Sequence, residues 1–248
     1  MKTNQDLIID RFLEVKRLGF VPSNRGHNTG IGKTFEDYVG VVENNVDAPD
    51  LYGFEIKSHR ELSISYVTLF TKSPAFPKRA NAYLKDKYGE PYPNNPALKK
   101  LHASMFASKY TSVYNKYNFK LLNDRENSVV RIGIFDPANN QLVDSCVGYT
   151  YDCLEAILKK KLKNLFYVSA QTKTIGTQEH FHFNKAEIFT NPTLKKFLKL
   201  IDDGVIMYDI RIGSYSSGHN YGKAHDHGSG FRILEKNLHL LFENHERF

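Results

Sequence analysis

The sequence predicts a mixed α/β fold in which helices flank a central β-sheet. Three observations support this prediction. Apolar residues at helical spacing alternate along the chain with short segments rich in Val, Ile and Phe. The 248 residues, 41% of them hydrophobic, are enough to bury the core of one domain. The chain has no internal repeat and no linker that would separate two domains, so we expect a single domain over 1–248.

The composition favours a cytoplasmic protein with a polyanionic partner. The formal net charge is +7, although many basic proteins bind no polyanion. The N-terminus lacks the apolar region of a signal peptide, and no run of about 18 apolar residues predicts a membrane span. Cys146 and Cys153 are the only cysteines, too few for a disulfide framework and suited to a reducing compartment.

The first 70 residues alternate between predicted helices and strands. Apolar spacing predicts a helix over 6–18, and a Gly/Asn-rich segment then opens into a second helix over 34–42. Residues 49–57 read as a turn followed by a short strand, because Pro and Gly precede alternating apolar and charged residues. Residues 62–70 are a β-rich partner for that strand.

Residues 73–128 differ from the rest in being rich in Pro, Asn, Tyr and Lys. We interpret them as an insertion outside the main sheet, with a helix near 96–107. The interleaved aromatic and basic residues suit a nucleic-acid flank. A solvated insertion around a small aromatic core explains the same composition.

The second half continues the alternation of helices and strands. Predicted strands cover 129–135 and 142–147 as a hairpin, then 165–172, 181–190 and 205–215. Predicted helices cover 151–162, 191–201 and 231–242. A long glycine- and histidine-rich loop lies before the last helix.

The most informative stretch is 49–57, where Asp50, Glu55 and Lys57 can converge. Residues two apart on a strand share a face, so Phe54 and Ile56 point into the core while Glu55 and Lys57 emerge together on the other side. A bend at the glycine brings Asp50 to the same place. The set is either a divalent-metal site beside a cationic group or a surface salt-bridge cluster.

The chain contains a second copy of these letters, with Asp10, Glu14 and Lys16 inside the first predicted helix. Residues two apart on a helix point about 200° apart and cannot share a ligand. The pattern there is a solvated helix face. The letters alone therefore do not establish a catalytic site.

Hydrolysis of a phosphodiester would give each residue of the set a role. A metal ion neutralises charge and lowers the pKa of the attacking water, and Mg²⁺ usually takes one or two carboxylates. Asp50 and Glu55 could supply these, while Lys57 orients the water and stabilises negative charge. Glu36 on the preceding helix could add a ligand through water or hold Lys57.

These residues, with the pattern Gly30-x-Gly32-Lys33-x-x-Glu36 and the C-terminal segment YDIRIGSYSSGHNYGKAHDHGSGFRILEK, resemble the MvaI/BcnI group of monomeric type II restriction endonucleases. That group belongs to the MutH-like branch of the PD-(D/E)xK nucleases. The resemblance implies a PD-(D/E)xK core, with Asp50, Glu55 and Lys57 catalytic, Glu36 supporting them, and Asp50 and Glu55 as metal ligands. It also implies a catalytic lobe of about 1–72 and 129–190, and recognition elements in about 73–128 and 205–248.

The same resemblance implies an activity. The expected reaction is Mg²⁺-dependent hydrolysis of duplex DNA at CC(A/T)GG, cut after the second C with 5′-phosphate ends, by a monomer that nicks the strands in sequence. Mn²⁺ would substitute, and Ca²⁺ would support binding without cleavage. A cognate methyltransferase in a bacterial cytoplasm is implied genetically rather than as a physical partner. A MutH-like nicking enzyme or a catalytically silent DNA-binding module is the alternative.

Asp209 and Arg211 are candidates for reading the DNA sequence. They share a strand face, and Arg can bind guanine O6 and N7 while Asp accepts from cytosine N4. Arg232 could contact a second guanine. Without the family resemblance, the favoured explanation is a pair formed only between Asp209 and Arg211 on an exposed strand, because exposed pairs of this kind are common.

Other candidates come from polar loops. We expect DNA contacts from Lys223, His225 and His227 near the C-terminus, from Asn24, Arg25, His27, Asn28 and Lys33 in the glycine-rich segment, and from Ser58, His59 and Arg60 after the catalytic lysine. The pairs His225/His227 and His180/His182 could instead bind a transition metal, as a small-molecule hydrolase would require, but no closed set of four ligands accompanies them.

Overall fold

A computed structural model describes residues 2–26, 29–41, 49–61 and 65–248. The chain forms two compact units. Unit 1 comprises Met1–Ser65, Leu158–Thr193 and Phe242–Phe248, and unit 2 comprises Tyr66–Ile157 and Leu194–Leu241. Both contain β-sheet with helices, so the predicted mixed α/β class is confirmed.

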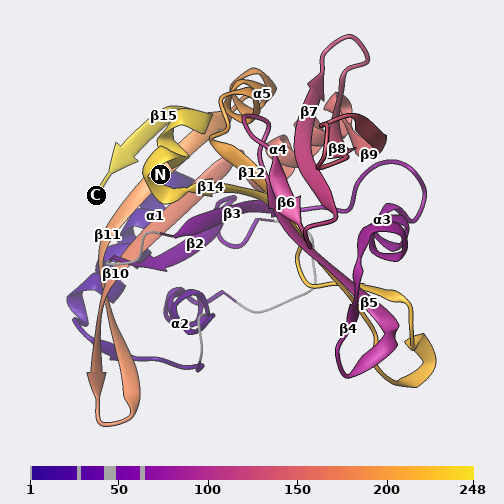
Figure 1. Cartoon of the computed structure of the whole chain (residues 1–248). Helices are drawn as coiled ribbons and strands as arrows, with labels where there is room; N and C mark the ends of the chain where they lie inside the picture. Colours follow the sequence, from indigo (N-terminus) through magenta and orange to yellow (C-terminus); the bar gives the residue numbers. More distant parts are fainter. Residues whose placement is uncertain (1, 27–28, 42–48, 62–64) are drawn as a thin grey trace. The chain divides into compact units, whose positions relative to one another are not determined.

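Unit 1 contains a mixed five-stranded sheet in which β2 is an edge strand (Figure 1). The path runs β1-β11-β10-β2, with β15 added on β11, and only β2 and β10 pair in parallel. The strands are β1 Val21–Pro22, β2 Glu55–Arg60, β10 Asn164–Ile175, β11 Gln178–Pro192 and β15 Phe242–Arg247. The predicted strands 165–172 and 181–190 are thus confirmed, and both extend further than predicted.

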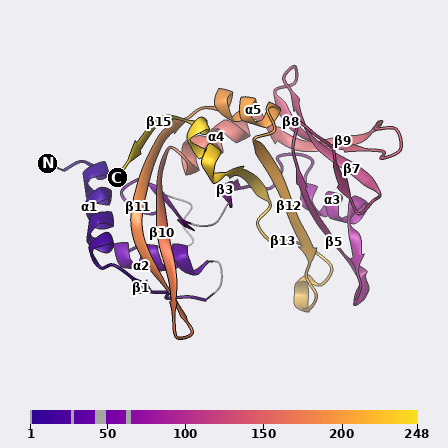
Figure 2. The ribbon, with the colours of Figure 1, turned by 60° about the vertical axis from the view of Figure 1, so that its left-hand side comes forward.

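Helices α1 (Asn4–Arg17) and α2 (Gly30–Val39) pack beside this sheet (Figures 1 and 2). Thr3 and Asp6 form a capping box that starts α1, and Gly40 ends α2 in a left-handed conformation. Phe166 of β10 lies with its ring centroid 6.0 Å from that of Phe12 in α1 and 6.4 Å from that of Phe35 in α2. These buried rings connect both helices to the sheet.

Unit 2 contains two sheets. The first follows the order β3-β14-β12-β5-β4, with β13 on β12, and the second follows β6-β7-β8-β9. The strands of the first are β3 Tyr66–Thr71, β4 Glu90–Tyr92, β5 Asn95–Met105, β12 Ile206–Ser214, β13 Ala224–Asp226 and β14 Gly230–Leu234. Those of the second are β6 Thr111–Val113, β7 Tyr117–Asp124, β8 Val129–Phe135 and β9 Leu142–Thr150. The predicted hairpin of 129–135 and 142–147 is confirmed as β8 and β9.

The remaining helical segments are α3 (Ala80–Tyr88), α4 (Tyr151–Lys161), α5 (Leu194–Asp202) and the 3₁₀ turns η1 (Gly218–Asn220) and η2 (Glu235–Leu241). α4 and α5 confirm the predicted helices 151–162 and 191–201. β3 confirms part of the predicted strand 62–70, of which 62–64 lie outside the described residues. Its expected pairing with the strand after residue 54 is wrong, because β3 pairs with β14 in unit 2 whereas β2 pairs with β10 in unit 1. Within the described residues, no helix is both long and apolar enough to cross a membrane.

The helix predicted near 96–107 is wrong, because this segment is strand β5. Leu98, Leu101 and Met105 are buried at spacings that also fit a helix, which explains the misassignment. Antiparallel pairing of β5 with β12 determines the strand, in which Leu101, Ala103 and Met105 alternate with exposed residues. The helix of this region is α3, which the sequence analysis missed.

The helix predicted over 231–242 is also wrong. β14 ends at Leu234, η2 follows, and Phe242 begins β15. Phe231 and Ile233 are fully buried on either side of partly buried Arg232, as strand pairing with β12 and β3 requires. The apolar residues Leu238, Leu241 and Phe242 supplied a helical spacing that the chain uses only for the short turn η2.

Asp144 of β9 joins the second sheet of unit 2 to α3. The hydroxyls of Tyr83 and Tyr88 and the Lys87 ammonium donate to its carboxylate, as does the backbone N–H of Cys146 at 2.9 Å. Burial opposes ionisation of Asp144, but these four donors together outweigh it and hold its pKa well below the usual range. The Asp144 carboxylate is therefore ionised, and its hydrogen bonds connect β9 to α3.

We predict that Asp144→Ala lowers the free energy of unfolding by about 2–4 kcal/mol at pH 7, because the buried Tyr88 and the partly buried Tyr83 hydroxyls lose a charged acceptor. The folded-state pKa lies below the unfolded one, so the stabilisation is complete above a pH of about 4 and declines as the pH falls toward the folded-state value. Urea denaturation at pH 7 and pH 3 measures both effects. Asp152→Asn, at an exposed helical carboxylate, is the control; an equal loss in both variants would contradict the prediction.

Candidate active site and nucleic-acid interface

The start of β2 places its charged and apolar side chains on opposite faces. Phe54 and Ile56 are 4% and 5% exposed and belong to the core of unit 1. Glu55 and Lys57 point to the other face, partly accessible, and the Lys57 ammonium lies 3.2 Å from Glu55 Oε1. The predicted strand alternation is therefore confirmed.

A tight bend returns Asp50 to the same strand. Leu51 and Phe54 exchange backbone hydrogen bonds of 3.1 and 2.8 Å, with Tyr52 and Gly53 in left-handed conformations between them. Asp50 Oδ2 accepts the backbone N–H of Ile56 at 2.7 Å. Among the described residues β2 is an edge strand, and this carboxylate accepts an N–H that no described strand on that side binds. Asp50 thus lies beside the peptide that links Glu55 to Ile56.

The donor set fits a hard divalent cation. Among the described residues, no group of three or more His, Cys, Asp or Glu side chains could hold a metal ion. Asp50 and Glu55 offer carboxylate oxygens, and Mg²⁺ is usually bound by one or two carboxylates plus water and substrate phosphate. Glu36 lies partly buried on α2, the helix that packs against β2.

Other predicted residues of unit 1 have protein partners. Arg60 donates to both carboxylate oxygens of Glu179 at 2.7 Å, which lowers the pKa of Glu179. The buried His59 ring stacks on Tyr167 with centroids 4.9 Å apart, and its Nδ1 lies 3.3 Å from the hydroxyl of Ser169.

The glycine-rich segment before β2 is described in part. The Lys33 ammonium lies 2.9 Å from Asp37, and hydrogen bonds from Lys33 and Asn24 lower the pKa of that carboxyl. Arg25 is exposed in the segment that precedes α2. His27 and Asn28 lie outside the described residues.

Asp209 of β12 is the buried centre of the candidate reading site in unit 2. It is 5% exposed, and its Oδ1 accepts the Ser104 hydroxyl at 2.7 Å. Its Oδ2 accepts Nε of Arg211 at 2.6 Å and lies 2.9 Å from Nε of Arg232. The Asp209–Arg211 pair therefore exists, but on a buried carboxylate and not on the exposed strand of the simpler interpretation.

The two arginines differ in exposure. Arg232 is 11% exposed and also donates to the Thr68 hydroxyl and, at 3.0 Å, to the Gly228 carbonyl. Burial lowers the pKa of Arg232 despite the Asp209 charge. The Arg211 side chain is 51% exposed, and among the described residues its terminal nitrogens have no hydrogen-bond partner. Arg211 is thus held at one end and open at the other.

A cavity of 660 Å³ lies over this pair. Its lining includes Tyr92, His102 and Ser104, which the sequence analysis missed. Tyr92 belongs to β4, and His102 and Ser104 belong to β5. Because a helix was predicted over 96–107, the alternation of His102 and Ser104 with buried neighbours was not noticed. The interleaved basic and aromatic residues of 73–128 were the only signal.

The predicted loop residues lie close to Arg211. The His227 backbone N–H donates to the Arg211 carbonyl at 2.8 Å, and the rings of His225 and His227 have centroids 4.2 Å apart. His225 also stacks on Tyr215 at 4.3 Å, while the Lys223 ammonium binds Asn220 Oδ1 at 3.1 Å. Two of the predicted histidines therefore adjoin the reading strand.

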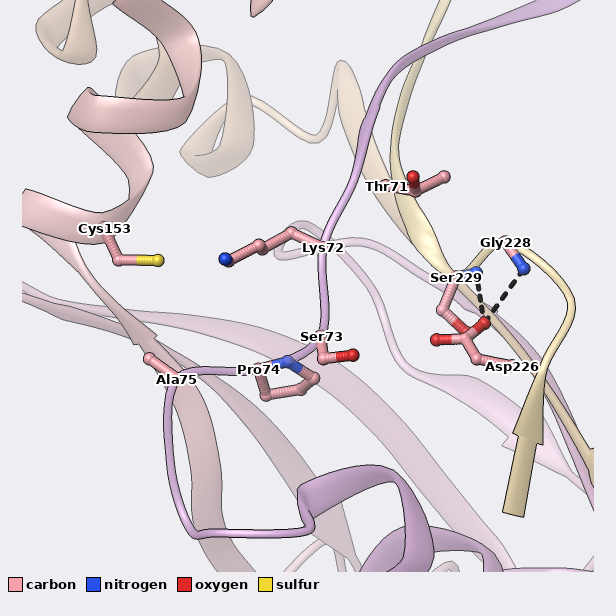
Figure 3. A pocket seen from close by; sticks show the side chains of 9 residues that line it. All are labelled: Thr71, Lys72, Ser73, Pro74, Ala75, Cys153, Asp226, Gly228 and Ser229. Carbon is pink, nitrogen blue, oxygen red and sulfur yellow. Dashed lines mark hydrogen bonds between the residues drawn. The ribbon is translucent and has the colours of Figure 1, made fainter. Parts of the chain in front are cut away.

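Asp226 accepts two hydrogen bonds from the turn that follows His227, at Gly228 and Ser229 (Figure 3). Asp226 Oδ1 accepts the N–H groups of Gly228 and Ser229 at 2.9 and 2.7 Å, and the Ser229 hydroxyl accepts the N–H of Arg211 at 2.8 Å. A second cavity, of 630 Å³, separates this turn from the segment 71–75, where Lys72 points toward Cys153 (Figure 3).

The family model of the MvaI/BcnI restriction endonucleases matches residues 9–242 of the chain. The solved complex of restriction endonuclease MvaI with cognate DNA substrate is 36% identical, covers 100% of this chain and 99% of its own, and gives a TM-score of 0.88. The structure of MvaI in the absence of DNA is also 36% identical, covers 100% and 98%, and gives a TM-score of 0.67. A search of curated proteins found no match.

We predict that Asp50→Ala accelerates hydrogen exchange of the Ile56 amide by roughly 10- to 100-fold, because a hydrogen bond to a charged acceptor contributes about 1.5–3 kcal/mol. Asp50→Asn keeps an acceptor oxygen and should retain most of the protection. Amide exchange followed by NMR measures the effect, with the Val168 amide of β10 as the internal reference. Unchanged Ile56 exchange in Asp50→Ala would show that another group covers this N–H.

Proposed function

The chain belongs to the MvaI/BcnI restriction endonuclease family, and we propose that it cleaves duplex DNA at CC(A/T)GG after the second C, leaving 5′-phosphate ends. The family makes it a type II site-specific deoxyribonuclease. Full-length similarity to MvaI, whose structure was solved as a complex with cognate DNA substrate, supports DNA as the partner. The target CC(A/T)GG is the one that the resemblance of the sequence to this family implies.

The observation that carries the proposed chemistry is the convergence of three side chains at the start of β2. Asp50 reaches the Glu55–Ile56 peptide, and Glu55 holds the Lys57 ammonium on the same face. The buried Phe54 and Ile56 fix the orientation of that face. The similar set Asp10, Glu14 and Lys16 in α1 lacks this geometry. Glu14 pairs there with Arg11 at 2.9 Å.

Asp50 and Glu55 would hold Mg²⁺, or Mn²⁺ as a substitute, with Glu36 supporting them from α2. When bound, the ion lowers the pKa of the attacking water and offsets charge on the phosphate. Lys57 positions the water by donating a hydrogen bond and stabilises the developing negative charge. Release of Lys57 from Glu55 makes its ammonium available for this task.

Arg211 would read a guanine. Its terminal nitrogens are open to the cavity and suit the bidentate contact with O6 and N7. Asp209 fixes the Arg211 side chain through Nε, which favours an orienting role over a direct contact with cytosine. The engagement of Arg232 by Asp209, Thr68 and Gly228 likewise favours a positioning role over a second guanine contact.

Seven further residues stay predicted DNA contacts: Lys223, His225, His227, Arg60, His59, Lys33 and Arg25.

We further propose that the enzyme acts as a monomer that nicks the two strands in sequence, in a bacterial cytoplasm that also contains a cognate methyltransferase. A MutH-like nicking enzyme would leave nicked circles as the final product, and a silent binding module would leave DNA intact. Plasmid digestion with Mg²⁺ or EDTA separates these outcomes, and sequencing the fragment ends gives the target and cut position.

We predict that Glu55→Ala lowers plasmid cleavage by roughly a hundredfold or more, because a metal ligand and the partner of Lys57 are lost. Binding of a CC(A/T)GG duplex in Ca²⁺ should persist in a gel-shift assay. Glu14→Ala is the matched control, since it removes the glutamate of the same letters in α1. Equal loss of binding and cleavage in Glu55→Ala would assign Glu55 a structural role.

Arg211→Ala should weaken discrimination at one G·C pair by about 1–3 kcal/mol, as expected for loss of a bidentate guanine contact. The measurement is the cleavage rate on the cognate duplex relative to duplexes with a single substituted base pair. Arg125→Ala, which removes an exposed arginine paired with Asp202 in the same unit, should leave the ratios unchanged. Wild-type discrimination in Arg211→Ala would refute the guanine contact.

A further inference from the structure

The β4–β5 hairpin places polar side chains directly opposite the Asp209–Arg211 pair. In the antiparallel register of β5 and β12, His102 lies opposite Arg211 and Ser104 lies opposite Asp209. Directly opposed residues share a face of the sheet. The Ser104–Asp209 hydrogen bond of 2.7 Å shows that the side chains on this face meet. His102 is therefore the cross-strand neighbour of the arginine proposed to read guanine.

Gly213, two residues beyond Arg211 on β12, leaves space on this face for two more polar groups. A Cβ atom at Gly213 would lie 2.7 Å from the Tyr92 hydroxyl and 3.0 Å from Nε2 of His227. Both atoms therefore occupy the place of the absent side chain. Tyr92 comes from β4 and His227 from the turn after β13, so two different segments meet over this glycine.

These groups line a continuous groove. Tyr92 and His227 belong both to the 660 Å³ cavity over Arg211 and to a neighbouring cavity of 550 Å³. The second cavity is also lined by Asn94, Asn95 and His225. The groove thus combines hydroxyl, amide and imidazole groups, which can both donate and accept hydrogen bonds. Such groups suit base edges, whereas phosphates call chiefly for donors.

The surroundings of His102 favour its neutral form. Burial, with further contributions from Lys100, His227 and Arg211, lowers the pKa of His102, and Asp209 only partly opposes them. A neutral imidazole offers one donor and one acceptor, whereas an imidazolium offers two donors. His102 can therefore distinguish base edges that differ in their donor and acceptor pattern.

We propose that His102 is a specificity-determining residue that contacts the base pair next to the one read by Arg211, and that Tyr92 and His227 form the adjoining part of the same reading groove. This inference rests on the proposed function. It assigns base recognition to the β4–β5 hairpin, in addition to strand β12.

The test uses the full-length enzyme and a panel of duplexes, each with one substituted base pair of CC(A/T)GG. His102→Ala should reduce discrimination at one position on the order of tenfold, and that position should adjoin the one affected in Arg211→Ala. His102→Gln, which keeps one donor and one acceptor group, should restore part of the discrimination. His239→Ala, at an exposed histidine of η2, is the control for loss of a surface imidazole.

A second variant reaches the groove independently. Gly213→Ala places a methyl group against the Tyr92 hydroxyl and His227, and should also weaken discrimination without removing a hydrogen-bonding group. Wild-type discrimination at all five positions in both His102→Ala and Gly213→Ala would overturn the inference. The two failures are distinguishable. If only this inference fails, the wild-type enzyme still cuts the cognate duplex specifically, and both variants discriminate as it does. If the proposed function fails, the wild-type enzyme does not cut the cognate duplex.

Discussion

The proposed catalytic face depends on the burial of Phe54 and Ile56. Each side chain removes apolar surface from water, and the strand period of two then forces Glu55 and Lys57 outward together. The Phe54 ring also lies 6.4 Å from that of Phe166, the residue that contacts both α1 and α2. A shift of one residue in register would bury the charged pair, which carries a large desolvation cost. Core packing thus fixes which side chains of β2 point away from the core.

Asp209 performs a comparable task in unit 2 through charge. A buried carboxylate is unfavourable unless it is paired and fully hydrogen-bonded, and here it receives a hydroxyl and lies against two guanidinium groups. These partners come from β5, from β12 itself and from β14, so one anion joins three neighbouring strands. The arrangement restricts Arg211 before any ligand arrives, which reduces the entropy lost on binding.

The sequence was most informative where local pattern and tertiary structure agree. Alternation of Phe54, Glu55, Ile56 and Lys57 predicted both the strand and the two faces that the structure shows. The secondary-structure prediction failed for 96–107. Leu98, Leu101 and Met105 fit a helix and a strand equally, and only pairing with β12 decides between them. His102 was missed for that reason, because its position opposite Arg211 depends on the register of β5 with β12, more than 100 residues further along the chain. The burial of Asp209 was equally hidden, since no local pattern reveals a second arginine from β14.

The alternation along β5 separates two requirements that often conflict during evolution. Leu101, Ala103 and Met105 hold the strand in the core, while His102 and Ser104 face the groove. Ser104 donates to the buried Asp209 carboxylate and is therefore constrained, whereas the exposed His102 can be replaced with the packed residues left in place and at little cost in stability. Glu55 and Lys57 lie in the other compact unit, and such changes do not touch them. Under the proposed roles of these residues, a new target sequence would require exchanges in one hairpin and would leave the proposed hydrolytic residues unchanged.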